Sequence, residues 1–173
     1  MDARAAAGAG KAERYAALAE EIAAVLEDEP NRIARMASVA AMLAAAFETF
    51  LWTGFYLVDP DRPGELVVGP YQGALGCLRI ALGAGVCGAA AAQRRTLVVP
   101  DVDAFPGHIA CDSRARSEIV VPVLDGAGAL VGVLDVDSAD AAAFDGVDAA
   151  GLERIVAETF AAARLRAASG DSG

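Results

Sequence analysis

Apolar residues in the first part of the chain recur at spacings of three and four, which is the pattern of one helix face. The pattern runs over residues 11–28, breaks at "EPN" and resumes up to about Phe47. Asn31 stands directly before the second run, where its side chain can cap a helix. We therefore predict two consecutive amphipathic helices. Their apolar stripes are Tyr15, Leu18, Ala19, Ile22 and Leu26, followed by Ile33, Met36, Val39, Ala40 and Leu43.

The pattern then changes to short apolar runs that are rich in β-branched and aromatic residues and bounded by Gly and Pro, which is typical of strands. The turn "DGAGA" joins the last two runs and predicts a hairpin. Between the third and fourth runs, "GAGVCGAAAAQRR" predicts a glycine turn that leads into a short helix. The predicted strands are "LWTGFYLVDP", "ELVVGP", "CLRIAL", "TLVVPD", "SEIVVPVL" and "LVGVLDVDS".

A closing helix is predicted from near Asp145 to Ala167. Together these elements predict an α+β fold, with a central antiparallel sheet of about six strands covered on one face by the N- and C-terminal helices. We expect residues 1–10 to form a flexible tail, residues 11–168 a single domain and residues 169–173 a disordered end. The stripe of the closing helix is Leu152, Ile155, Val156, Thr159 and Phe160.

Composition narrows the class of protein. The 173 residues suffice for one domain with a sizeable core, and 55% hydrophobic with 22% charged residues indicates a globular chain. The net charge of −10 makes nucleic acid and anionic membrane surfaces unfavourable partners. No run approaches the roughly 20 apolar residues of a membrane span, and "MDARAAAGAG" lacks the apolar centre of a signal peptide. We expect a cytoplasmic protein, in which any disulfide is transient and catalytic.

Acidic residues gather on one face of the predicted hairpin. Asp135 and Asp137 are two apart in a strand and therefore share a face, and Glu118 lies near them if the two last strands pair. The face is either solvated or an acidic cleft, in which like charges oppose ionisation. A divalent cation site is a third interpretation, although "DVD" lacks the spacing of a calcium loop. Glu118 alternatively forms a salt bridge with Arg114 or Arg116.

Two aromatic residues share a face on the first predicted strand. Trp52 and Tyr56 have the parity of Gly54, so their rings line one side around a gap. Such a set forms an aromatic box for a small ligand or an ordinary part of the core.

The three cysteines differ in their surroundings. Cys111 lies in the polar loop "PDVDAFPGHIACDSRARSEI", where His108 and two arginines favour a thiolate and Asp112 opposes it. Cys87 follows a glycine turn at a helix start, where it is either a thiolate favoured by the helix dipole or a small buried residue. Cys77 begins a strand, where a core position is the simple interpretation.

Three cysteines and one histidine are also a possible zinc ligand set, but the paired short spacings of zinc sites are missing. A Cys–His protease is less favoured, because nothing indicates a positioned nucleophile. The set suits a reaction that forms and resolves a sulfenic acid, with one attacking thiolate, a second condensing cysteine and an acid that supplies a proton. We expect no metal and no other cofactor. The substrate does not follow from these residues.

Several segments resemble a known family, the free methionine-(R)-sulfoxide reductases, which are single-domain proteins of the GAF fold. Ordinary GAF sensor domains share the strand pattern but not the three cysteines or the "FPGHIACDS" loop. The resemblance implies reduction of free L-methionine-(R)-sulfoxide to methionine, regeneration by thioredoxin and a homodimer. A non-catalytic GAF module that binds a small ligand is the alternative. The segments are "WTGFYL", "LVVGPYQG", "CLRI", "GAGVCG", "TLVVPDVDAFPGHIACDS", "RSEIVVPV" and "LVGVLDVDS".

The resemblance also implies roles for the cysteines. Cys111 matches the attacking thiolate, Cys77 the principal resolving cysteine, and Cys87 a third cysteine of less settled role that is also a candidate nucleophile. The chain departs from the family before Cys77, where "YQGALGC" replaces a more usual Phe, basic residue and proline. It departs again at Ala89, where threonine is common.

The resemblance assigns the acids and aromatic residues to the substrate. Glu118, Asp135 and Asp137 match the residues that hold the substrate ammonium and polarise or protonate the sulfoxide oxygen. Trp52 and Tyr56 match the wall against the methyl-sulfinyl end. Carboxylates suit a free amino acid, because peptide-bound methionine lacks the ammonium that they would select.

Overall fold

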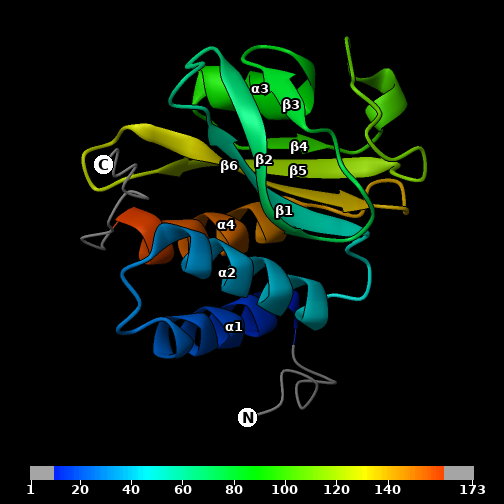
Figure 1. Cartoon of the computed structure of the whole chain (residues 1–173). Helices are drawn as coiled ribbons and strands as arrows, with labels where there is room; N and C mark the ends of the chain where they lie inside the picture. The colour runs from blue at the N-terminus through cyan, green and yellow to red at the C-terminus, as the bar shows by residue number, and fades with distance from the viewer. Residues whose placement is uncertain (1–9, 162–173) are drawn as a thin grey trace.

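The computed structural model describes residues 10–161 and has one six-stranded antiparallel sheet between two layers of helix. The strand order is β3-β2-β1-β6-β5-β4. Helices α1, α2 and α4 pack together on one face of the sheet, and α3 lies on the other (Figure 1). The predicted α+β fold, with the first and last helices on one face, is confirmed.

The elements follow the predicted order along the chain. The helices are α1 Lys11–Val25, α2 Arg32–Ala46, α3 Gly85–Gln93 and α4 Gly146–Val156, which continues as a π-helical turn over Ala157–Ala161. The strands are β1 Trp52–Val58, β2 Glu65–Gln72, β3 Arg79–Ala81, β4 Leu97–Val99, β5 Ser117–Leu124 and β6 Leu130–Ser138. A short 3₁₀ turn, Val102–Ala104, interrupts the long polar loop.

The predicted ends of the chain lie outside the described residues. The predicted tail at residues 1–10 lies outside them except for Gly10. The last turns of the closing helix up to Ala167 and the predicted end at residues 169–173 also lie outside them. Within residues 10–161, no helix is long and apolar enough to cross a bilayer.

Side-chain caps fix the starts of α2 and α4. The Asn31 side chain accepts hydrogen bonds from two backbone N–H groups of the first turn of α2 at 2.9 and 3.0 Å, which confirms the predicted cap. Asp145 caps α4 in a capping box with Asp148. Tyr15 and Lys11 of α1 bond to Asp148 at 2.9 and 2.7 Å, so the first helix is tied to the start of the last.

The larger core lies between the sheet and helices α1, α2 and α4, and it contains almost all of the predicted helix stripes. Among the apolar stripe residues Ile33 is the exception, with 40% of its surface exposed, because α2 contributes to this core only from Met36 onward. The buried apolar side chains of β1, β5 and β6 on this face are Phe55, Ile119, Val121, Val123, Leu134 and Val136.

The strand register gathers the predicted site residues on the opposite face. In the antiparallel ladders, Asp137 lies opposite Trp52 on one side and opposite Glu118 on the other, and Gly54 lies opposite Asp135. Directly opposed residues point to the same face of a sheet. The β5–β6 hairpin is confirmed, and its pairing places the acids and Trp52 together on the face covered by α3.

Gly54 is required by the close packing of the aromatic residues. A Cβ at this position would overlap the Tyr71 side chain and lie 2.7 Å from the Trp52 ring. We expect Gly54→Ala to lower the free energy of unfolding by about 1–3 kcal/mol, because overpacking forces the rings to move. Gly64→Ala is the matched control, since nothing lies within 4 Å of its added Cβ. Equal urea midpoints for the two variants would contradict this packing.

Candidate active site

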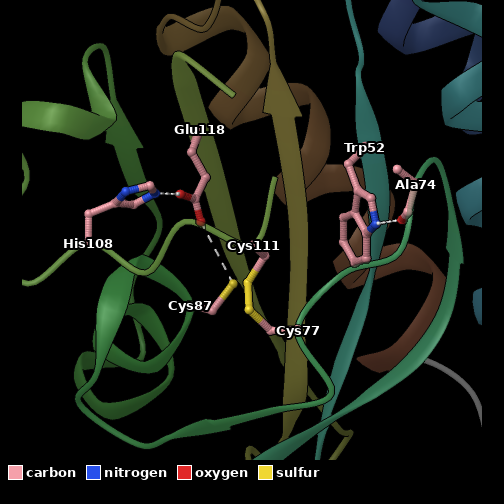
Figure 2. Close-up of a disulfide and its surroundings, with 7 residues drawn as sticks. All are labelled: Trp52, Ala74, Cys77, Cys87, His108, Cys111 and Glu118. Carbon is pink, nitrogen blue, oxygen red and sulfur yellow. Dashed lines mark hydrogen bonds and ion pairs between the residues drawn. A yellow bond between two sulfur atoms is a disulfide. The ribbon is translucent and has the colours of Figure 1, made fainter. Parts of the chain in front are cut away.

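A disulfide joins Cys77 to Cys111, with a Cα–Cα distance of 5.2 Å (Figure 2). Cys77 lies in the loop between β2 and β3 rather than at the first residue of a strand, because β3 begins only at Arg79. Cys111 lies in the polar loop before β5, and both cysteines are partly exposed. Two loops that are distant in sequence are thus linked on the face of the sheet that carries the acids.

Cys87 is the free cysteine of the described residues and is buried, with 4% of its surface exposed. Its Sγ lies 3.8 Å from Glu118 Oε1, to which the thiol donates (Figure 2). Burial raises the pKa of Cys87 well above its usual value, and the charges of Asp135 and Glu118 raise it further. Desolvation therefore outweighs the helix dipole, and the small buried residue is the better of the two sequence interpretations.

Glu118 lies between Cys87 and His108. His108 Nε2 is 3.6 Å from Glu118 Oε2, so the histidine faces this acid (Figure 2). Burial, and then the charge of Asp137, raises the pKa of Glu118 to about 8. The salt bridge considered for Glu118 does not form with Arg114, which binds Asp112 at 2.7 Å.

The two aspartates of β6 complete an acidic group. Asp135 is 6% exposed, and its Oδ1 has no hydrogen-bond partner among the described residues. Burial, and then the charge of Glu118, raises the pKa of Asp135 well above its usual value. Burial, and then the charge of Asp135, also raises the pKa of Asp137, which is partly exposed. The structure therefore favours the acidic cleft over the solvated sheet face.

These groups line a small cavity that opens to solvent, and the space around them, its open part included, is about 360 Å³. Its walls come from the start of α3, the polar loop that carries Cys111, and strands β5 and β6. A molecule in this cavity would meet a sulfur of the disulfide, buried acids with raised pKa values and a polar atom without a partner among the described residues. The lining residues are Ile80, Ala84, Gly85, Val86, Cys87, His108, Ile109, Cys111, Asp112, Ala115, Glu118, Asp135 and Asp137.

Trp52 and Tyr56 lie beside this cavity but do not line it. Their rings stack with centroids 5.6 Å apart, and both are buried. The loop that carries Cys77 covers them, because Trp52 Nε1 donates to the Ala74 carbonyl at 3.0 Å, and a Cβ added at Gly76 would lie 3.0 Å from the Tyr56 hydroxyl and 3.2 Å from the Trp52 ring. With the disulfide closed, the two aromatic residues are therefore part of the smaller core.

Two parts of the cavity wall have no counterpart among the sequence predictions. Gly85 and Val86 line the cavity at the start of α3, and Ile109 lines it from the polar loop. The glycine turn before Cys87 signals that a helix begins there, but its position against β5 and β6 depends on long-range packing.

One group of side chains in the described residues has the geometry to hold a metal ion. Ligand atoms of Cys87, Glu118 and Asp135 lie within 4.8 Å of one another, the one such group found within residues 10–161. One thiol and two carboxylates differ from the cysteine- and histidine-rich sets of structural zinc sites. The arrangement is better suited to proton transfer beside a thiol.

Comparison with known proteins agrees with the architecture. Residues 33–163 match the GAF domain family. The chain belongs to the GAF-domain family. The matched segment contains all six strands of the sheet together with α3, α4 and nearly all of α2, so it includes every residue that lines the cavity.

This GAF-domain protein is similar to several known proteins along most of its length. GAF domain-containing protein A of Dictyostelium discoideum is 49% identical over 146 residues, which are 84% of this chain and 90% of that protein. The free methionine-R-sulfoxide reductase of Escherichia coli (strain K12) is 40% identical over 148 residues, which are 86% of this chain and 87% of that protein. The X-ray structure of the free methionine-R-sulfoxide reductase from Neisseria meningitidis in complex with its substrate matches with a TM-score of 0.83. The two sequences are 48% identical, and the match covers 88% of this chain and 90% of that chain.

The pKa of Glu118 predicts how stability depends on pH. The folded protein retains this proton up to about pH 8, whereas the unfolded chain releases it near 4.5. The folded state therefore binds more protons between these values, and the free energy of unfolding should fall as pH rises. Between pH 5.5 and 8 the free energy of unfolding should therefore fall by about 1–3 kcal/mol less in Glu118→Gln than in the wild type. Denaturant titrations of the disulfide-bonded protein measure this, with the exposed Glu48→Gln as control. Parallel pH profiles for wild type and Glu118→Gln would contradict it.

Proposed function

We propose that this GAF-domain protein reduces free L-methionine-(R)-sulfoxide to L-methionine, with Cys111 and Cys77 as its redox pair. The observation that carries the proposal is a disulfide between these two cysteines at a cavity lined by buried acids. The names of the Escherichia coli and Neisseria meningitidis relatives support the same activity.

The reaction is a two-electron reduction in two steps. The Cys111 thiolate attacks the sulfoxide sulfur, the oxygen takes up a proton, and it passes to Cys111 as a sulfenic acid while methionine leaves. The Cys77 thiol then attacks the sulfur of the sulfenic acid, and the oxygen leaves as water after a further proton transfer. The products are methionine, water and the disulfide. Thioredoxin would reduce that disulfide, since it exchanges dithiol for disulfide.

The acids have two tasks in this scheme. A protonated carboxyl group of the set Glu118, Asp135 and Asp137 supplies the proton to the sulfoxide oxygen, which the raised pKa values favour near neutral pH. An ionised member binds the ammonium of the amino acid. Cys87 is not required as a nucleophile, because its thiol is buried and bonded to Glu118.

The remaining parts of the proposal concern the whole protein. Residues 11–168 would act as one catalytic domain within a homodimer. The protein would work in the reducing cytoplasm, where disulfides are usually transient and catalytic. Trp52 and Tyr56 would meet the methyl-sulfinyl group once Cys77 is released and its loop moves away. A non-catalytic GAF module would bind methionine without turning over the sulfoxide.

A single turnover without reductant separates the three cysteines. Pre-reduced Cys111→Ser should yield no methionine, because no other thiol can accept the oxygen. Cys77→Ser should yield about one methionine per subunit and stop as a sulfenic acid, because attack precedes resolution. Cys87→Ser should resemble the wild type most closely.

Methionine per subunit and dimedone labelling of the sulfenic acid are the measurements. Thioredoxin-driven turnover of Cys77→Ser should fall far more than its first turnover, because no Cys77–Cys111 disulfide forms for thioredoxin to reduce. A full first turnover by Cys111→Ser, with none by Cys87→Ser, would assign the attack to the buried cysteine.

Asp135→Asn should lower kcat/KM at least about tenfold, because a charged hydrogen bond contributes about 1.5–3 kcal/mol. Asp137→Asn should act in the same direction. Asp140→Asn is the matched control, because this aspartate is exposed just beyond β6. Steady-state kinetics with the free sulfoxide and its N-acetyl derivative provide the test. A comparable rate on the N-acetyl compound would refute ammonium recognition.

A further inference from the structure

Exposed apolar side chains gather beside the disulfide. Leu75 is 75% exposed and Leu78 is 66% exposed, and both belong to the loop that carries Cys77. Ile109 is also exposed and lies two positions before Cys111. We call these three residues the apolar rim. The other large exposed apolar side chains of the described residues are not close to a cysteine in sequence, and they are Val25, Ile33, Val98 and Val147.

The two segments that contain the apolar rim carry almost no charge. Residues 71–78 contain no Asp, Glu, Lys, Arg or His, and residues 104–110 contain only His108 from this group. Charged residues make up 22% of the whole chain, so these segments differ from the rest of it. Apolar patches of a protein surface commonly mark the place where a ligand or a partner binds.

The apolar rim is small enough to lie within one protein contact. The Cα atoms of Cys77 and Cys111 are 5.2 Å apart. Because consecutive Cα atoms are 3.8 Å apart, the Cα atoms of the three rim residues lie within about 20 Å of one another. A weak redox encounter buries up to about 600 Å² on each partner, which is a patch roughly 28 Å across. A protein that reaches the disulfide therefore contacts the rim as well.

The disulfide indicates which kind of partner the rim fits. Under the proposed function one disulfide forms in every catalytic cycle, and it is opened by thiol–disulfide exchange, in which a thiolate touches one of its sulfurs. A permanent cover over the rim, such as a second copy of this chain, would block that attack. The partner must therefore bind transiently and supply a dithiol.

The two sulfurs of the disulfide differ in their surroundings. Cys111 lines the cavity, whereas Cys77 and the two leucines beside it do not. A protein is too large to enter this cavity, so it meets the partly exposed Cys77 from outside. Attack on the Cys77 sulfur also releases Cys111 as a thiolate, which is the form that attacks the next sulfoxide.

We propose that the apolar rim is the docking surface for a protein dithiol reductant, whose thiolate attacks Cys77 Sγ. The need for this reduction in each cycle rests on the proposed function. The attack breaks the Cys77–Cys111 bond and forms a mixed disulfide between Cys77 and the reductant. The second thiol of the reductant then attacks its own first sulfur and releases Cys77. The reductant ends as a disulfide, and its two electrons and two protons end on the two cysteines of this protein.

The rate at which reduced thioredoxin opens the disulfide tests this proposal, and no sulfoxide is needed. The test variant is Leu75→Ser combined with Leu78→Ser, because both side chains are exposed and neither lines the cavity. Val25→Ser is the matched control, since this valine is 60% exposed at the end of α1, on the other face of the sheet. The rate of reduction by dithiothreitol reports on the disulfide itself, because this small molecule does not need a docking surface.

We expect the second-order rate constant with thioredoxin to fall at least about tenfold in the double variant, because the contact loses the burial of two leucines. With dithiothreitol the double variant should stay within about twofold of the wild type, which also shows that it is folded. Val25→Ser should match the wild type with both reductants. An unchanged rate with thioredoxin would overturn the docking surface. Equal losses with both reductants would also overturn it, because the leucines would then act on the disulfide rather than on the partner.

A trapping experiment identifies the attacked sulfur. Thioredoxin in which the second cysteine of the Cys-x-x-Cys pair is replaced by serine stops at the mixed disulfide. After acid quenching and digestion, mass spectrometry should find this bond mainly at Cys77. A mixed disulfide mainly at Cys111 would overturn the assignment of the attack.

Size-exclusion chromatography of the oxidised proteins tests a second copy of the chain as the alternative occupant. Equal elution of the wild type and the double variant supports a transient partner, and a smaller assembly in the double variant would refute the docking surface. The proposed function can fail separately. A protein that thioredoxin reduces through the rim, but that does not convert free methionine-(R)-sulfoxide, would refute that function and support the docking surface.

Discussion

Three carboxyl groups share one small buried volume, and this constraint governs the rest of the site. Glu118, Asp135 and Asp137 are brought together by the register of β5 and β6 and cannot all ionise, because each negative charge opposes the next in a poorly solvated space. Their protons are therefore retained to higher pH and belong to the set rather than to one residue. A site that must protonate an oxygen and hold a cation can use such a set for both tasks.

Burial of these acids depends on what covers the sheet. The face packed against α1, α2 and α4 has a conventional apolar core, whereas the other face has a smaller core that includes Trp52 and Tyr56 beside the cavity. Helix α3 closes this second face with small residues, and Gly88 allows close approach to the Ala81 backbone. The short side chains let the start of the helix come near the strands, which brings Cys87 into contact with Glu118.

Much of this arrangement could be predicted from local rules. The period of two in β6 places Asp135 and Asp137 on one face, and a short turn before β6 predicts the hairpin that adds Glu118. The proximity of Cys77 and Cys111 could not be derived in this way, because it depends on the paths of two loops separated by 34 residues. The resemblance to known reductases supplied that pairing. For Cys87, the local argument from the helix dipole favoured a thiolate, and desolvation by the surrounding fold opposes it. Likewise, the side chains that His108 and Arg114 pair with, Glu118 and Asp112, depend on the path of the polar loop.

The contact between Trp52 and the loop that carries Cys77 gives the chain an internal optical marker. Trp52 is the single tryptophan, and its indole donates to the carbonyl of Ala74, three positions before the disulfide cysteine. The emission of an indole depends on its hydrogen bonding and on the polarity around it. Any displacement of this loop, including one caused by reduction of the disulfide, is therefore transmitted to one fluorophore of the unlabelled chain.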